Sequence, residues 1–92
     1  GFGETSIVMH LAPHLVAPDM PPRNVPDKIA GHSHIGFNGK PVMFGWTSDD
    51  FGPTGVIGDA TGANAAHGKV LFDRGVDFVS EALAEIDGFE FA

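Results

Sequence analysis

The residues best suited to chemistry stand at the start of the chain, in the run Gly1-Phe-Gly-Glu4-Thr5-Ser6, directly before a stretch with helical periodicity. A carboxylate in the first turn of a helix is stabilised by the free backbone amides and the helix dipole. From that position it can orient an imidazole or accept a proton. Glu4 is therefore the candidate catalytic residue. The alternative, that Glu4 only supports the start of the helix, stays open at this point.

Two of the five histidines, His32 and His34, form a His-x-His pair in a Gly-flanked loop. On a strand this spacing places both imidazoles on one side, where they can bind Zn or Cu. No third ligand stands nearby in the sequence, so we expect a substrate-pocket or interface role ahead of a metal role. His10 and His14 have the four-residue spacing of helical zinc ligands, but Pro13 distorts that turn, and both are predicted to be surface residues.

Acidic side chains also occur in a glycine-rich run, at Asp49, Asp50 and Asp59. Paired carboxylates can perform acid-base catalysis or bind a hard cation. Hydrogen bonds from turn amides explain these residues more simply, because Asp favours such bonds beside Gly and Pro. Residues 52–62 lack the Lys-Ser/Thr ending of a phosphate-binding loop, so no phosphate site is predicted there.

Two helices must position these residues. Apolar residues recur every three or four positions over residues 5–15, and again from Phe72 to Ile86, which predicts helices over 5–15 and 64–87. Asn64 is suited to cap the second helix. Glycine within a helix costs about 1 kcal/mol relative to alanine, so Gly68 and Gly75 predict close approach of a neighbouring backbone.

The rest of the chain reads as connections around one strand. Residues 17–41 are rich in Pro, Gly, Asp and Asn without a sustained period, which predicts an irregular connection. The apolar run 42–46 predicts a buried or edge strand, and the turn-forming pairs in 47–63 predict a loop.

The composition excludes several classes of function. Twelve Asp and Glu against five Lys and Arg give a formal net charge of −7, which disfavours binding to nucleic acid phosphates. No apolar run approaches the roughly 20 residues that cross a bilayer, so no membrane role is expected. The chain has no Cys and therefore no disulfide or thiolate site. The cytoplasm is the default location.

Two stretches of the sequence resemble the creatininase (creatinine amidohydrolase) family. Gly1-Phe-Gly-Glu-Thr-Ser6 and Pro13-His-Leu-Val16 are similar to the family's His-x-Gly-x-x-Glu-Thr-Ser motif and the Pro-x-Leu-Val segment that ends its helix. The turn-rich run that follows Trp46 resembles the family's Gly-Val-x-Gly-Asp-Pro-Thr segment, with Ala60 where Pro is usual. The His of the first motif would stand two positions ahead of Gly1.

The resemblance implies an α/β fold, with residues 1–92 as the C-terminal part of one three-layer α/β/α sandwich of creatininase type that a partner chain completes. It implies hydrolysis of a C–N bond in a small cyclic amide or related amide, with a divalent metal (Zn, Mn or Fe) bound mainly by the partner chain. Glu4 would be catalytic and this chain would supply no metal ligand. The expected substrate-binding residues are Gly3, Thr5, Ser6, His32, His34 and Trp46.

The resemblance also implies partners. We expect this chain to be the small subunit of a cleaved precursor, paired with the N-terminal chain of that precursor and assembled into a higher homo-oligomer such as a hexamer of the pair. Its ligand would be a small-molecule substrate. Two alternatives remain open: a non-catalytic assembly or metal-binding interaction module, and a self-contained metallohydrolase that uses His32, His34 and an acid.

Overall fold

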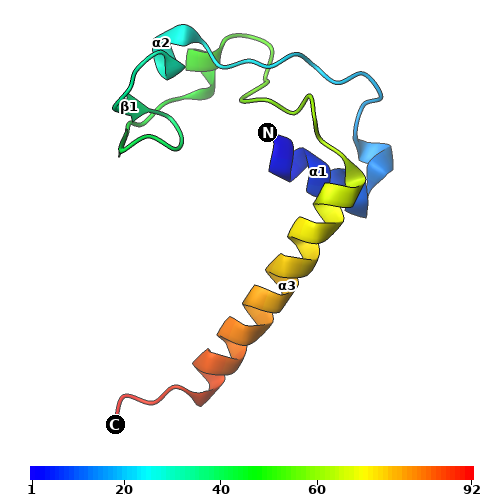
Figure 1. Cartoon of the computed structure of the whole chain (residues 1–92), viewed down its shortest axis with the longest axis vertical. Helices are drawn as coiled ribbons and strands as arrows, with labels where there is room; N and C mark the ends of the chain where they lie inside the picture. Colours follow the sequence, from blue (N-terminus) through cyan, green and yellow to red (C-terminus); the bar gives the residue numbers. More distant parts are fainter. The chain divides into compact units, whose positions relative to one another are not determined.

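A computed structural model describes all 92 residues, which form two compact units (Figure 1). One unit comprises residues 3–17 and 63–92, and the other comprises residues 1–2 and 18–62. In chain order the elements are α1 (Phe2–Leu11), the 3₁₀ helix η1 (Pro13–Leu15), α2 (Asp27–Ala30), β1 (Ile35–Gly36), β2 (Val42–Met43), the 3₁₀ helix η2 (Ser48–Phe51) and α3 (Ala65–Gly88). Helices combined with a small parallel sheet are compatible with the expected α/β class.

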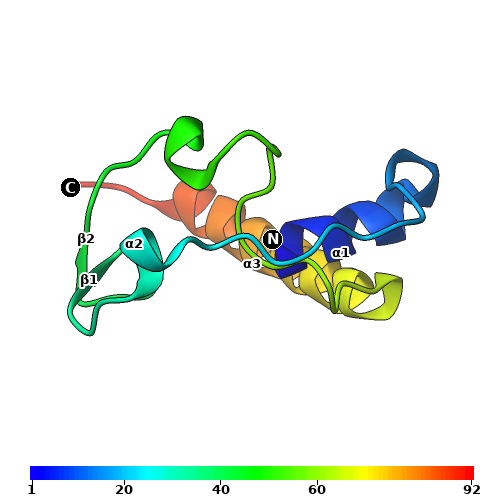
Figure 2. The same ribbon diagram turned by 90° about the horizontal axis from the view of Figure 1, so that it is seen from above.

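The helical unit is built on the crossing of α1 with the N-terminal end of α3 (Figures 1 and 2). Ser6 on α1 and Gly68 on α3 are both buried. A Cβ atom at Gly68 would overlap the carbonyl group of Ser6 and would lie 2.8 Å from the amide nitrogen of Ile7. The absence of a side chain at Gly68 therefore lets the two backbones meet, as the sequence predicts for this glycine.

The prediction that a neighbouring backbone approaches Gly75 closely is wrong for this chain. No atom lies within 4 Å of the position that a Cβ at Gly75 would occupy. Gly75 instead borders an open apolar groove between α1 and α3. The helix-propensity argument that identified both glycines cannot tell a covered position from an exposed one.

The observed limits of the helices differ from the expected ones. The first helix, expected over 5–15, begins at Phe2 and ends at Leu11, because proline at position 13 cannot continue it; the next residues form η1. The second, expected over 64–87, is α3 (Ala65–Gly88), with Asn64 as its N-cap. The Asn64 Oδ1 atom accepts a hydrogen bond of 2.8 Å from the His67 amide, which confirms the predicted cap.

The other unit contains the sheet, and here the expected elements need correction. The strand predicted over 42–46 is only the two-residue β2, and it pairs in parallel with β1, which lies inside the connection expected to be irregular. The five residues between the strands turn at Gly39, whose φ of 71° is in the left-handed region that glycine adopts readily. Val42 and Met43 are exposed and the sheet has two strands, so this run forms an edge strand, one of the two possibilities that its apolar pattern indicated, and not a buried one.

An aromatic cluster and one isoleucine form the core of this unit. The rings of Phe37, Trp46 and Phe51 meet edge to face, with centroids 4.9 to 6.1 Å apart. Phe51 and Ile29 are the buried hydrophobic residues of the chain. None of the helices combines the length and apolar character that a membrane crossing requires.

Candidate functional site

Glu4 lies in the first turn of α1 with an exposed side chain. A hydrogen bond from its own backbone amide is the largest cause that lowers the pKa of Glu4 below its ordinary value of 4.5. The carboxylate is ionised at neutral pH, as an exposed Glu ordinarily is, and it can accept a hydrogen bond from a group placed beside it.

The three neighbours of Glu4 that were predicted to bind substrate have different surroundings. Gly3 and Thr5 are half-buried, and a Cβ at Gly3 would be in ordinary contact with Leu71 on α3. Ser6 is fully buried, and its hydroxyl oxygen accepts a hydrogen bond of 3.1 Å from the Asn64 amide. Ser6 thus fastens α1 to the start of α3, and its contribution to substrate binding stays a prediction.

His32 and His34 belong to the other unit, between α2 and β1, and both side chains are exposed. The Nε2 atom of His32 lies 3.3 Å from the carbonyl oxygen of Lys28. The backbone carbonyl of His34 accepts a hydrogen bond from the amide of Val42, which begins the pairing of β1 with β2. The imidazole of His34 takes no part in that pairing, so the strand contact leaves it available to a ligand.

Trp46 borders a hollow of about 240 Å³ in the same unit as the two histidines. Lys28, Ile29 and Phe44 also border it, together with Asp50. A cation, an anion and an indole ring therefore face one small space. Sequence reasoning identified Trp46 but missed Lys28, because Lys28 lies within a connection whose sequence shows no sustained pattern.

Asn24 holds the loop that carries the family-like glycine run, and sequence reasoning missed it as well. Its side-chain amide donates hydrogen bonds of 2.7 Å to the carbonyl of Phe51 and 2.8 Å to that of Val56. Its backbone exchanges two further hydrogen bonds with Gly58. Asn24 therefore anchors the segment from Phe51, at the end of η2, to Gly58 at several points.

Asp50 and Asp59 are occupied by turn hydrogen bonds. The Asp50 carboxylate accepts from the amide and the hydroxyl of Thr47, and the amide bond is the largest cause that lowers the pKa of Asp50. Asp59 accepts from the hydroxyl and amide of Thr61, and the hydroxyl is the largest cause that lowers the pKa of Asp59. The turn interpretation of Asp59 is confirmed, whereas Asp50 bonds backwards along the chain.

The side chains of this chain do not fit a catalytic metal. Nowhere do three or more His, Asp or Glu side chains gather closely enough to hold a metal ion. A catalytic metal needs about three protein ligands and an open position. A divalent metal, as the creatininase resemblance implies, would therefore need ligands from outside this chain.

Comparison with known proteins identifies the family. The sequence matches the creatininase family model, described as creatinine amidohydrolase, over residues 1–83. The chain belongs to the creatininase family, a family of hydrolytic amidohydrolases. No curated protein and no solved structure matches the sequence. The matched region contains Glu4, the residues around Trp46 and most of α3.

Proposed function

We propose that this chain is the small subunit of a metal-dependent amidohydrolase that cleaves a C–N bond in a small cyclic amide or a related amide. The family match over residues 1–83 is the observation that carries the proposal. Within it, Glu4 is the catalytic carboxylate, and the residues expected to bind substrate are Gly3, Thr5, Ser6, His32, His34 and Trp46.

The chemistry of Glu4 supports this role. The carboxylate is ionised at neutral pH, and its exposed position leaves it accessible to a second chain. An ionised carboxylate can take up a proton as a nucleophile attacks the amide carbon, or it can hold an imidazole in one tautomer. Both roles need a reacting group supplied from outside this chain.

The absence of a ligand cluster supports a companion chain in this proposal. Because no three ligand side chains gather here, the divalent metal (Zn, Mn or Fe) is bound mainly by that companion. We infer that the companion is the N-terminal chain of the same precursor and that the pair assembles further into a homo-oligomer such as a hexamer. When bound, the metal would supply a Lewis acid beside the amide.

The test is purification of the assembly from its native source, with mass spectrometry, metal analysis and an assay of creatinine and related cyclic amides. We expect a second polypeptide, stoichiometric divalent metal and turnover that neither chain shows alone. Glu4→Gln should lower kcat by about 100-fold or more while leaving metal content and assembly unchanged. Turnover by this chain alone, or an assembly without metal, would overturn the proposal.

The second candidate is a non-catalytic assembly module, and the exposed apolar residues of α3 favour it. A module of this kind would associate with its partner while Glu4→Gln changed no activity. The Glu4→Gln assay therefore separates the two functions. Replacing His32 and His34 together by Ala tests the third hypothesis, a self-contained metallohydrolase. If that hypothesis holds, the isolated chain binds metal and the double variant loses it.

A further inference from the structure

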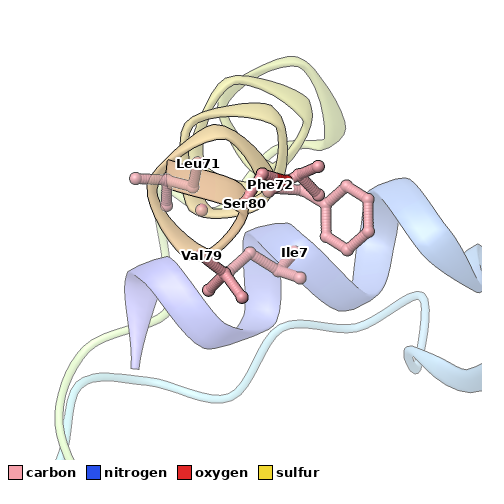
Figure 3. Close-up of a pocket in the computed structure, with 7 residues that line it drawn as sticks. Ile7, Leu71, Phe72, Val79 and Ser80 are labelled. Atoms are coloured by element: carbon pink, nitrogen blue, oxygen red, sulfur yellow. The ribbon is translucent and has the colours of Figure 1, made fainter. Parts of the chain in front are cut away.

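The hollow beside Trp46 differs in character from the groove in the helical unit. The groove, of about 430 Å³, is bordered almost entirely by apolar side chains such as Ile7 and Leu71 (Figure 3). Under the proposed function, the companion chain would cover such a surface. The hollow of about 240 Å³ in the sheet-containing unit has Lys28 and Asp50 on its border instead. Opposite charges around one small space indicate recognition of a polar ligand.

Lys28 brings available hydrogen-bond donors to the hollow. Its ammonium group makes no hydrogen bond and no ion pair within the chain. Lys28 belongs to α2, and the side chain of the next residue, Ile29, is buried and also borders the hollow. The backbone of α2 is therefore held at the hollow by packing, while the three N–H donors of Lys28 remain available to a ligand.

Asp50 brings an available acceptor to the same space. Both of its side-chain hydrogen bonds, from the amide and the hydroxyl of Thr47, go to the Oδ2 atom, so the Oδ1 atom has no donor from the chain. The Thr47 amide is the largest cause that lowers the pKa of Asp50, and the charge of Lys28 contributes to the same shift. The two charges interact but form no ion pair. A ligand group that both accepts and donates can lie between them.

Trp46 supplies a flat apolar surface beside these two charges. Its side chain is 39 % exposed, and the rings of Phe37 and Phe51 hold it by edge contacts with centroids 6.1 and 4.9 Å away. A planar ring can stack on such an indole. The volume of about 240 Å³ lies below the roughly 300–1,000 Å³ of pockets for drug-sized ligands, so the ligand is a small ring.

We propose that the hollow binds the C(=O)–N–H edge of a small planar ring. Lys28 donates to the carbonyl oxygen, Asp50 Oδ1 accepts from the N–H group, and the ring lies against Trp46. The ligand is neutral, because a carboxylate would meet Asp50 and a cation would meet Lys28.

This inference rests on the proposed amidohydrolase function and narrows its substrate to a cyclic ureide, a ring in which a urea group is closed through a further carbonyl. The hollow holds the C(=O)–N–H edge of the urea group. The bond that is hydrolysed is the C–N bond at the further carbonyl, and water adds across it to give a carboxylate and an N–H group.

The fluorescence of Trp46, the only tryptophan of the chain, tests binding without a metal, a companion chain or turnover. Hydantoin, a simple cyclic ureide, should change the fluorescence saturably when titrated through the millimolar range. The analogue 1,3-dimethylhydantoin has no N–H group and should bind about 10-fold or more weakly. Lys28→Met, which removes the donors, should weaken hydantoin binding by a similar factor. Lys40→Met is the matched control, because Lys40 lies in the same unit but does not border the hollow.

Asp50→Asn tests the acceptor. The Asn oxygen can keep the hydrogen bonds from Thr47, but its NH₂ group then places a donor where Oδ1 was an acceptor, so hydantoin should bind about 10-fold or more weakly. Asp49→Asn, at the exposed neighbour, is the control, and circular dichroism should show unchanged secondary structure in every variant. No saturable change with hydantoin, equal binding of the dimethyl analogue, or unchanged binding by Lys28→Met would each overturn the proposal.

Turnover by the assembled enzyme separates this inference from the proposed function. Creatinine carries an amino group where hydantoin has its urea oxygen, so Lys28→Met should lower kcat/KM for hydantoin, mainly through KM, by about 10-fold more than for creatinine. An equal fall for both compounds would overturn the recognition role of Lys28 and leave the amidohydrolase function standing. Lys28-dependent binding of hydantoin without turnover of either compound would overturn the amidohydrolase function and the substrate assignment, and would support the hollow as a ligand site.

Discussion

The crossing of α1 over α3 depends on the missing side chain at Gly68, and replacing it by alanine tests the crossing directly. A Cβ there would lie 1.8 Å from the carbonyl oxygen of Ser6, against the 3.4 Å at which ordinary contact begins. The obstructing atoms belong to the backbone, so no rotamer change relieves the overlap. The two helices must therefore separate by about 1.6 Å at this point.

The expected cost of Gly68→Ala follows from what this separation breaks. Overpacking of this kind costs about 1–3 kcal/mol. The hydrogen bond from the Asn64 amide to the buried Ser6 hydroxyl, 3.1 Å long, would also be lost, at about 1 kcal/mol. Alanine returns about 1 kcal/mol through its higher helix propensity. We therefore expect the free energy of unfolding to fall by about 1–3 kcal/mol.

Gly75→Ala is the matched control because it makes the same change in the same helix. No atom lies within 4 Å of the new Cβ, so only the propensity gain of up to about 1 kcal/mol remains. Urea unfolding followed by far-ultraviolet circular dichroism, at concentrations where the chain is monomeric, measures both variants. Equal or greater stability of Gly68→Ala relative to Gly75→Ala would refute the close crossing.

The remaining predictions concern the sheet-containing unit. Asn24→Ala should lower the free energy of unfolding by about 2 kcal/mol, because it removes both side-chain hydrogen bonds to the 51–56 loop. Asn38 is exposed, so Asn38→Ala should change the free energy of unfolding little and serves as the control. Urea unfolding measures both variants. Since the folded pKa of Asp59 lies below its ordinary value of 3.8, its turn should be stable above that value and loosen as pH falls through the folded pKa. Thr61→Val should move the pKa of Asp59 back toward 3.8 in an NMR titration, and an unmoved pKa would contradict the role of the hydroxyl.

Features set by neighbouring residues could be predicted from the sequence. The Asn64 cap involves a residue three positions away, and the Asp59 turn involves one two positions away. Local hydrogen bonds of this kind depend on residue type and spacing alone. The existence of α3 follows in the same way from its apolar period.

Features that depend on distant contacts could not be predicted. Asn24 donates hydrogen bonds to residues 27 and 32 positions away. Strand β1 likewise depends on the amides of Val42 and Phe44, which donate hydrogen bonds to the carbonyls of His34 and Gly36. Lys28 and Trp46 border the same hollow although they are far apart in the sequence, and this depends on how the backbone folds between them. Residue type limits which side chains can make such contacts, but the three-dimensional path of the backbone selects the ones that do.

The candidate site also combines a feature that the sequence predicts with one that it does not. Residue type and position identify Glu4 as a candidate, but they do not identify the groups with which it would react. The match to creatininase assigns an amidohydrolase family to a chain whose acidic and histidine side chains form no metal cluster. A family reaction that needs several ligands cannot be completed by one exposed carboxylate. The same chain exposes apolar side chains along α3 and an apolar groove beside α1. Incomplete chemistry and uncovered apolar surface are separate observations, and the companion chain proposed above would account for both.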